Sequence, residues 1–167
     1  VGDLAAFLTT YEEQGPTAIG KAFDDRLGVA NLIQLLKNAP DTIELQAAFT
    51  VQEEIGLRGA KTAAFALKPD VAFVLDSTAA RDLPSHDRTE NTLYNTKYGH
   101  GPALYASDAA TISDPRLLQL AMNVAELNKI PYQIRQPGKG GTDAGNIHRS
   151  RSGVPTLSMS VPCRHIH

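Results

Sequence analysis

The sequence contains no tryptophan and only one cysteine, Cys163, among its 167 residues. A single cysteine excludes an internal disulfide, and we interpret it as a small residue in a protein of the reducing cytoplasm. Long apolar runs are also absent: none approaches the roughly 20 residues that a membrane-spanning helix needs, and no signal-peptide pattern opens the chain. These absences predict a soluble, cytoplasmic protein with no membrane partner.

The charge of the chain is nearly balanced, with 16 basic and 18 acidic residues and a formal net charge of −2. The sequence has no basic cluster, which argues against an electrostatically driven nucleic-acid partner. Apolar residues make up 42% of the chain, enough for the core of one compact domain. We therefore expect residues 1–167 to form a single domain. Because the chain begins at Val1 instead of an initiator Met, we also expect it to be a fragment.

Hydrophobic patterning predicts a strand, a helix and a second strand in the middle of the chain. The segment Asp41–Val51 alternates partly and contains β-branched residues, and Val71–Leu75 is apolar throughout, so both are predicted as strands. The Ala-rich segment Arg58–Leu67 between them predicts a helix, which stops at the following Lys-Pro-Asp sequence. Such a unit is a βαβ crossover and implies parallel pairing.

Further helices and strands flank this unit. Apolar spacing predicts one helix over 27–37, just after Asp24-Asp25, and another that starts with Pro115 in its first turn and runs to Leu127. Two more strands are predicted at Ile130–Ile134 and Pro155–Val161. Helices that alternate with strands around a mixed sheet indicate an α/β sandwich.

The most informative feature is the dipeptide Glu53-Glu54, which follows an apolar predicted strand and precedes Gly56. Neighbouring side chains of a strand point to opposite faces, so both carboxylates can reach one site only where the strand bends into a loop. One carboxylate can then bind a cation while the other handles a proton.

Other polar side chains lie at the ends of predicted elements. Asp24 precedes a helix, Asp76 ends the second strand, and His167 lies beyond the last strand. Open α/β sheets bind ligands beyond the carboxyl ends of their strands. Carboxylates with an imidazole suit Zn²⁺, Co²⁺ or Mn²⁺, whereas Ca²⁺ would need more oxygen ligands and no His. The excess of carboxylates over one tetrahedral sphere suggests two ions.

Each of these residues also has a purely structural explanation. Asp24 and its neighbour Asp25 could cap the following helix, as Asp commonly does. The Glu53-Glu54 pair could be solvated, and Asp76 could begin a turn.

Four segments, in order along the chain, resemble the successive signatures of the M42 aminopeptidases. They are Lys21–Gly28, Gln52–Ala60, Gly140–Gly145 and Val161–His167. Asp76 stands at the matching place between the second and third, and the resemblance runs from about Gly20 to the last residue. It implies a zinc-peptidase-like, three-layer α/β/α sandwich around a mixed, mostly parallel sheet.

The resemblance further implies a co-catalytic centre with two divalent ions, Zn²⁺, Co²⁺ or Mn²⁺. Asp24 would bridge the ions, and Glu54 and His167 would complete the ligands of one. Asp76 would bind the other, together with a His that the family supplies from a segment near its N-terminus and that this chain does not contain.

The implied activity is a metal-dependent aminopeptidase that removes N-terminal residues from peptides, with Glu53 as the general base. Thr142 and Asp143, in a glycine-rich loop, are expected to line the substrate pocket. The family inserts a dimerisation domain before the region matching Gly20 and adds a strand and a helix after the region matching His167. We expect the full-length protein to form dimers that assemble into a dodecamer, and this chain to be part of its catalytic domain.

Two other classes of function stay open. Paired acids are the hallmark of glycoside hydrolases of the endoglucanase type, but adjacent acids cannot easily straddle a glycosidic oxygen at separations of roughly 5–9.5 Å. The chain also has no Trp, which sugar-binding clefts commonly use as a platform. The other class is a non-catalytic assembly subunit or an inert fragment.

Overall fold

The computed structural model describes residues 2–83, 86–87, 96–138 and 140–167. The helices in these ranges are α1 (Phe23–Lys37), α2 (Arg58–Leu67), α3 (Pro115–Leu127) and α4 (Ala144–Ile147). The strands are β1 (Glu12–Gln14), β2 (Thr17–Ile19), β3 (Ala72–Ala79), β4 (Ala103–Tyr105), β5 (Gln133–Arg135) and β6 (Thr156–Cys163). None of the helices in the described ranges is long and apolar enough to cross a membrane.

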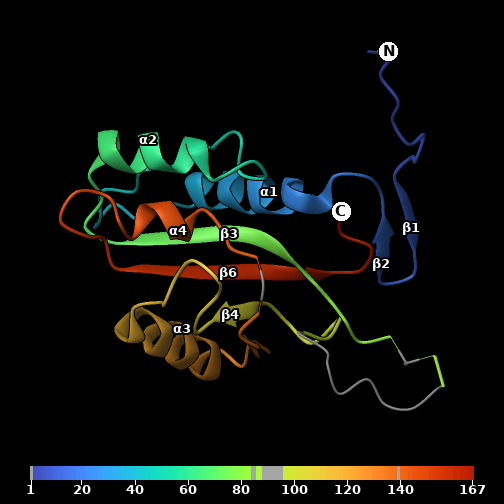
Figure 1. Ribbon diagram of the computed structural model, residues 1–167. Coiled ribbons are helices and arrows are strands. Elements are labelled where there is room, and N and C mark those ends of the chain that lie inside the picture. Colours follow the sequence, from blue (N-terminus) through green and yellow to red (C-terminus); the bar gives the residue numbers. More distant parts are fainter. Residues whose placement is uncertain (1, 84–85, 88–95, 139) are drawn as a thin grey trace.

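The central sheet has four strands in the order β3-β6-β4-β5. Strands β3 and β6 run parallel along their whole length, from Ala72 opposite Thr156 to Ala79 opposite Cys163. Strand β5 is parallel to β4, and β4 is antiparallel to β6, so the sheet is mixed. Strands β1 and β2 pair with each other as a separate antiparallel hairpin, at the right of Figure 1.

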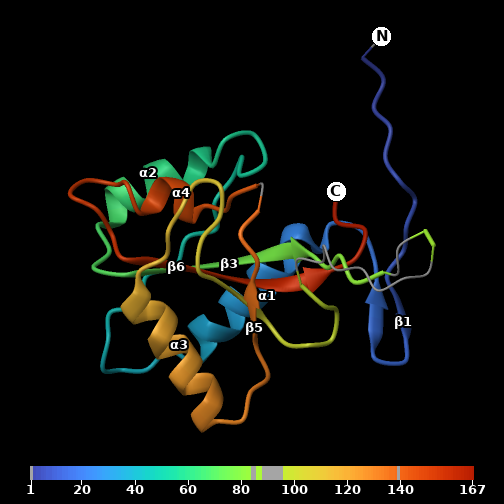
Figure 2. The same cartoon turned by 60° about the horizontal axis from the view of Figure 1, so that its bottom comes forward.

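Helices cover both faces of this sheet. Ser77 of β3 lies opposite Val161 of β6, and its hydroxyl donates to the carbonyl oxygen of Phe23 at the start of α1. Ser158 lies three residues before Val161 and so points to the other face, where its hydroxyl is hydrogen-bonded to Thr142 just before α4. Figure 2 shows α2 and α4 over one face and α1 and α3 over the other. The predicted three-layer α/β/α sandwich is confirmed.

The core is made of strand side chains and small helical residues. Val74, Leu104 and Leu157 are buried in the sheet, and Ala60 and Ala64 are buried on α2. Small residues let the helix approach the layer beneath it closely. The buried polar residues of β6, which include Thr156 and Ser158, are hydrogen-bonded, as buried polar groups generally are.

Most of the predicted elements are present. The helix predicted over Arg58–Leu67 is α2, and the helix predicted from Pro115 is α3, where the Asp114 side chain accepts a hydrogen bond from the Arg116 N–H. The strand predicted from Ile130 begins later, at Gln133. Pro131 has no N–H to donate to a ladder, and Lys129, two residues after the end of α3, has a positive φ.

The strand predicted over Asp41–Val51 is wrong, and so is the βαβ crossover that depended on it. This segment belongs to no strand, and β3 pairs with β6 alone among the described strands. Without a ladder partner, its apolar side chains face solvent, including Ile43 at 59% exposure and Phe49 at 51%. The residue pattern was that of a strand, but strand formation also requires a neighbour for the backbone N–H and C=O groups.

Helix α1 approaches the sheet through Gly28, and this contact can be tested. The Gly28 N–H donates to Oδ1 of Asp25 at 2.9 Å. A Cβ on Gly28 would lie 2.1 Å from Oδ2 of Asp25 and 2.6 Å from the carbonyl oxygen of Leu75. We expect Gly28→Ala to lower the free energy of unfolding by about 1–3 kcal/mol or more, as overpacking does. The measurement is urea unfolding of the purified protein.

Gly138→Ala is the matched control for this variant. A Cβ on Gly138 would meet nothing closer than 3.8 Å, so its effect should be small. An equal loss of stability in both variants would show that the contact with Asp25 and β3 is not the cause.

Candidate metal centre

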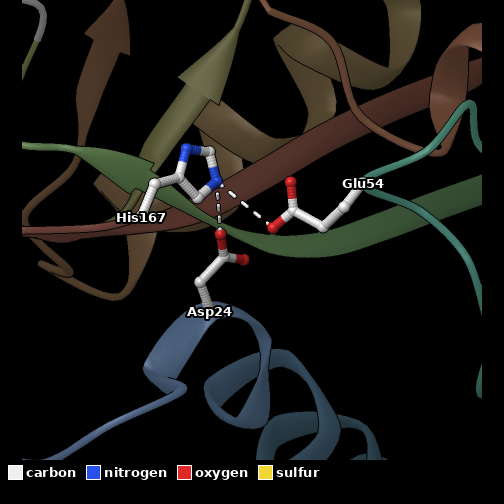
Figure 3. A group of neighbouring side chains, drawn as sticks. All are labelled: Asp24, Glu54 and His167. Carbon is white, nitrogen blue, oxygen red and sulfur yellow. Dashed lines mark ion pairs between the residues drawn. The ribbon is translucent and has the colours of Figure 1, made fainter. Parts of the chain in front are cut away.

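Three side chains that are distant in sequence converge at one point. Nε2 of His167 lies 3.0 Å from Oδ2 of Asp24 and 3.2 Å from Oε1 of Glu54. Figure 3 shows the imidazole directed at both carboxylates. Asp24 comes from the start of α1, Glu54 from the loop before α2 and His167 from the segment after β6. The structure therefore brings together the three residues predicted to hold one ion.

A second group of ligand atoms shares Asp24 with the first. One ligand atom from each of Asp24, Asp25 and Asp76 lies within 4.8 Å of the others, as is also true of Asp24, Glu54 and His167. Asp24 thus belongs to both clusters. Asp76 occupies the cluster predicted for the other ion, and Asp25 joins it as an addition to the predicted set.

The backbone at the start of α1 explains how two adjacent carboxylates reach this edge of the sheet. Asp24 and Asp25 have non-helical dihedral angles, and the peptide bond between them is cis. Asp25 caps the helix, since its Oδ1 accepts from the N–H of Gly28, while no capping hydrogen bond joins Asp24 to another described residue. The structural explanation by capping therefore applies to Asp25 and leaves Asp24 free to face His167.

The segment that carries His167 is fastened to the loop after β3. The Arg164 guanidinium donates to both carboxylate oxygens of Asp82, at 3.0 and 3.1 Å, and lies 5.0 Å from the ring centroid of Tyr98. The N–H of Tyr98 also donates to Asp82. These hydrogen bonds to Arg164 hold the pKa of the Asp82 carboxyl below its usual range. A two-point contact of this kind restricts the orientation of the chain three residues before His167.

The carboxylates of the centre share a strongly perturbed electrostatic environment. Burial, together with the charges of Asp25, Asp24 and Glu53, raises the pKa of Asp76 to about 8. A hydrogen bond from the Ser77 N–H acts in the opposite direction and lowers this pKa. Burial likewise raises the pKa of Asp25 to about 6, and burial and the charge of Glu54 raise that of Asp24. Crowded, partly buried acids favour the neutral form. A divalent cation would relieve this repulsion, and carboxylates with an imidazole are a suitable donor set for one.

Glu53 lies beside these clusters and belongs to neither of them. Burial, followed by the charges of Asp143, Glu54 and Asp24, raises the pKa of its carboxyl to about 7. Its carbonyl oxygen accepts hydrogen bonds from the N–H groups of Gly56 and Leu57, which turn the chain sharply after the dipeptide. The bend expected after the dipeptide is present. Glu53 is partly buried there, whereas Glu54 is exposed.

Thr142 and Asp143 lie close to the centre, but their side chains are directed into the protein. Thr142 is 2% exposed, and its hydroxyl is 2.7 Å from that of Ser158. Asp143 is 8% exposed and accepts a hydrogen bond from the hydroxyl of Thr50 at 2.5 Å. Thr50 was not identified from the sequence, because nothing in a local pattern reveals a partner so distant along the chain.

Comparisons with known proteins identify the family of the chain. The family model for M42 glutamyl aminopeptidases matches residues 1–167. A putative aminopeptidase of Acetivibrio thermocellus is 41% identical over 168 residues, which cover 100% of this chain and 49% of the relative.

Solved structures give the same result. A TET aminopeptidase from a marine-sediment Thaumarchaeota archaeon superimposes with a TM-score of 0.85 at 40% identity, over 95% of this chain and 45% of that one. For the TET1 peptidase of Pyrococcus horikoshii, which can assemble into a tetrahedron or a large octahedral shell, the TM-score is 0.74 at 35% identity, over 96% and 46% of the two chains. The chain thus spans about half the length of the relatives that it matches. It belongs to the M42 glutamyl aminopeptidase family.

Proposed function

We propose that residues 1–167 form part of the catalytic domain of a metal-dependent aminopeptidase and supply most of its dimetal centre. The observation that carries the proposal is the position of Asp24, which lies between a His167–Glu54 cluster and a cluster containing Asp76. A lone ion site would not need a carboxylate shared in this way.

The proposed ligands divide between two ions. Asp24 would be shared by the two ions, Glu54 and His167 would hold one of them, and Asp76 would hold the other with Asp25 in reach. When bound, a pair of Zn²⁺, Co²⁺ or Mn²⁺ ions would supply Lewis acidity that lowers the pKa of a coordinated water toward about 7. The donor set accepts each of these metals.

Glu53 is the proposed general base. Its carboxylate is outside both ligand clusters, and in the metal-free protein burial raises its pKa to about 7. A carboxylate that is not itself a ligand can take a proton from a nearby water and release it again. In the proposed reaction Glu53 removes a proton from the attacking water and then donates it to the leaving amine. Glu53 therefore takes up one proton and releases it again in each cycle.

The proposed substrates are peptides with a free N-terminus, as the activity named for the family implies. Because Thr142 and Asp143 are more than nine-tenths buried, whereas Gly140 and Gly141 are exposed, we propose that the glycine-rich loop contributes to the substrate pocket through the main chain of its glycines. By analogy with the TET1 assembly, we propose that the full-length protein is a homo-oligomer, and we retain the cytoplasm as its proposed location.

The function is tested by hydrolysis of aminoacyl p-nitroanilides by the full-length protein, with and without a chelator. We expect release of p-nitroaniline that the chelator abolishes and that added Zn²⁺, Co²⁺ or Mn²⁺ restores. Carboxymethylcellulose in parallel reactions addresses the glycosidase alternative, since a two-carboxylate glycosidase would be insensitive to chelation. Bound metal without turnover of either substrate would favour the non-catalytic alternative.

Substitution of Glu53 tests its role directly. We expect Glu53→Gln in the full-length protein to lower kcat by about 10²–10⁴-fold, because the amide cannot accept the proton. The metal content should stay at the wild-type value, since Glu53 is not a proposed ligand. Steady-state kinetics and elemental analysis of the purified variant give both quantities. Glu44→Gln, at an exposed position, is the matched control, and loss of metal from Glu53→Gln would make Glu53 a ligand.

The raised pKa values predict how pH affects the metal-free protein. Asp76, Glu53 and Asp25 have folded-state pKa values of about 8, 7 and 6, above those of an unfolded chain, which are roughly 4. The folded state therefore binds more protons, so stability should fall as pH rises from about 5 to 8. Thermal unfolding of the metal-free protein measures this, and Asp76→Asn should flatten the dependence. Stability that increases over the same range would contradict the assignment.

A further inference from the structure

Two segments that are distant in sequence are joined by hydrogen bonds beside the metal centre. We call residues 50–57 the glutamate loop and residues 140–146 the glycine-rich segment. At one end of the loop, the Thr50 hydroxyl donates to Oδ2 of Asp143 at 2.5 Å. At the other end, Nδ2 of Asn146 donates to the carbonyl oxygens of Gly56 and Leu57, at 3.3 and 2.8 Å. Glu53 and Glu54 lie between these two attachments.

Among the described residues, the backbone–backbone hydrogen bonds of the loop lie within it or join it to α2. The carbonyl oxygen of Glu53 accepts from Gly56 and Leu57, and that of Val51 accepts from Gly59 in the first turn of α2. These bonds set the shape of the loop. They do not set its distance from Asp24 and the other ligands, which come from α1, β3 and the segment after β6.

Asp143 is well placed to set that distance, because it is itself fixed to the sheet. Its neighbour Thr142 is hydrogen-bonded to Ser158 of β6, and the carbonyl oxygen of Asp143 accepts from Asn146 and Ile147 in α4. The Asp143 side chain is 8% exposed, and its Oδ1 has no hydrogen-bond partner among the described residues. A buried carboxylate that accepts from a hydroxyl forms one of the stronger hydrogen bonds in proteins.

We propose that Asp143 is a positioning residue, which acts through the Thr50 hydroxyl to hold Glu53 and Glu54 at the correct distance from the rest of the metal centre. This role presupposes the dimetal function proposed above. It differs from a substrate contact, because Asp143 touches the loop that carries the reacting groups and not the substrate. A displacement of about 1 Å in such groups can cost roughly 10²-fold in rate.

The principal test compares Thr50→Val with Thr50→Ser in the full-length protein. Valine removes the hydroxyl with little change in volume, whereas serine keeps it. We expect Thr50→Val to lower kcat by about tenfold or more with KM changed by less than about twofold, since misplaced catalytic groups affect the chemical step. Zn²⁺ should also bind about tenfold more weakly in a calorimetric titration, because Glu54 is on the same loop. Thr50→Ser should restore both quantities to near wild-type values.

Thr156→Val is the matched control. Thr156 is 2% exposed, and its hydroxyl donates to the carbonyl oxygen of Val154 at 2.9 Å. The variant loses a buried hydroxyl that has no connection to the glutamate loop, so kcat and Zn²⁺ affinity should remain those of the wild type. A similar loss in Thr156→Val and Thr50→Val would indicate general destabilisation and overturn the proposal.

A double-mutant cycle separates positioning from substrate binding. If Thr50 and Asp143 act as a unit, Thr50→Val combined with Asp143→Ala should be no worse than Asp143→Ala alone. A rise in KM in Asp143→Ala, with normal kinetics in Thr50→Val, would make Asp143 a substrate contact and overturn the proposal.

Two further outcomes remain decisive. If Thr50→Val does not fold, Thr50→Ala replaces it, because it also removes the hydroxyl that bonds to Asp143, and wild-type kcat and Zn²⁺ affinity in that variant would overturn the proposal. If the wild-type protein shows no chelator-sensitive peptidase activity, the proposed function fails, while the Zn²⁺ titrations of Thr50→Val, Thr50→Ser and Thr156→Val still test the positioning role.

Discussion

The parallel pairing of β3 with β6 is the constraint on which the metal centre depends. Both strands run in the same direction over eight residues each, so their carboxyl ends meet at one edge of the sheet. Asp76 lies within β3 near this edge, and His167 follows β6 shortly beyond it. Helix α1 packs on the same two strands, and Figure 1 shows its start beside the C-terminus. The ligands are therefore neighbours because the strands are parallel.

This arrangement opposes the stability of the metal-free fold. Each carboxylate at the edge is partly removed from water, and its neighbours carry the same charge, as the raised pKa values of Asp24, Asp25 and Asp76 express. A bound cation would stabilise the charged forms and release the protons that the metal-free protein retains. Occupancy of the centre and stability of the fold are consequently linked, and each affects the other.

Much of the fold and of the centre could be predicted from local signals. The apolar periods predicted α2 and α3, and the acids at the ends of elements, with the four family-like segments, predicted that Asp24, Glu54 and His167 would meet. What could not be predicted depends on distant contacts. The role of Asp25 follows from the backbone angles at the start of α1, and that of Thr50 follows from a partner that is 93 residues away in sequence. The Asp41–Val51 strand failed because its pattern says nothing about the presence of a neighbouring strand.

The meeting of Asp24 with His167 also has a kinetic consequence. Asp24 lies in α1, well before β3, and His167 follows β6, so the contact between them closes a loop that includes most of the chain. Contacts of such high sequence separation are costly in chain entropy and form late in folding. The complete set of ligands exists only when the segment after β6 lies beside the start of α1 and the loop before α2. A cation that requires all three ligands would therefore be acquired by folded chains and not by folding intermediates.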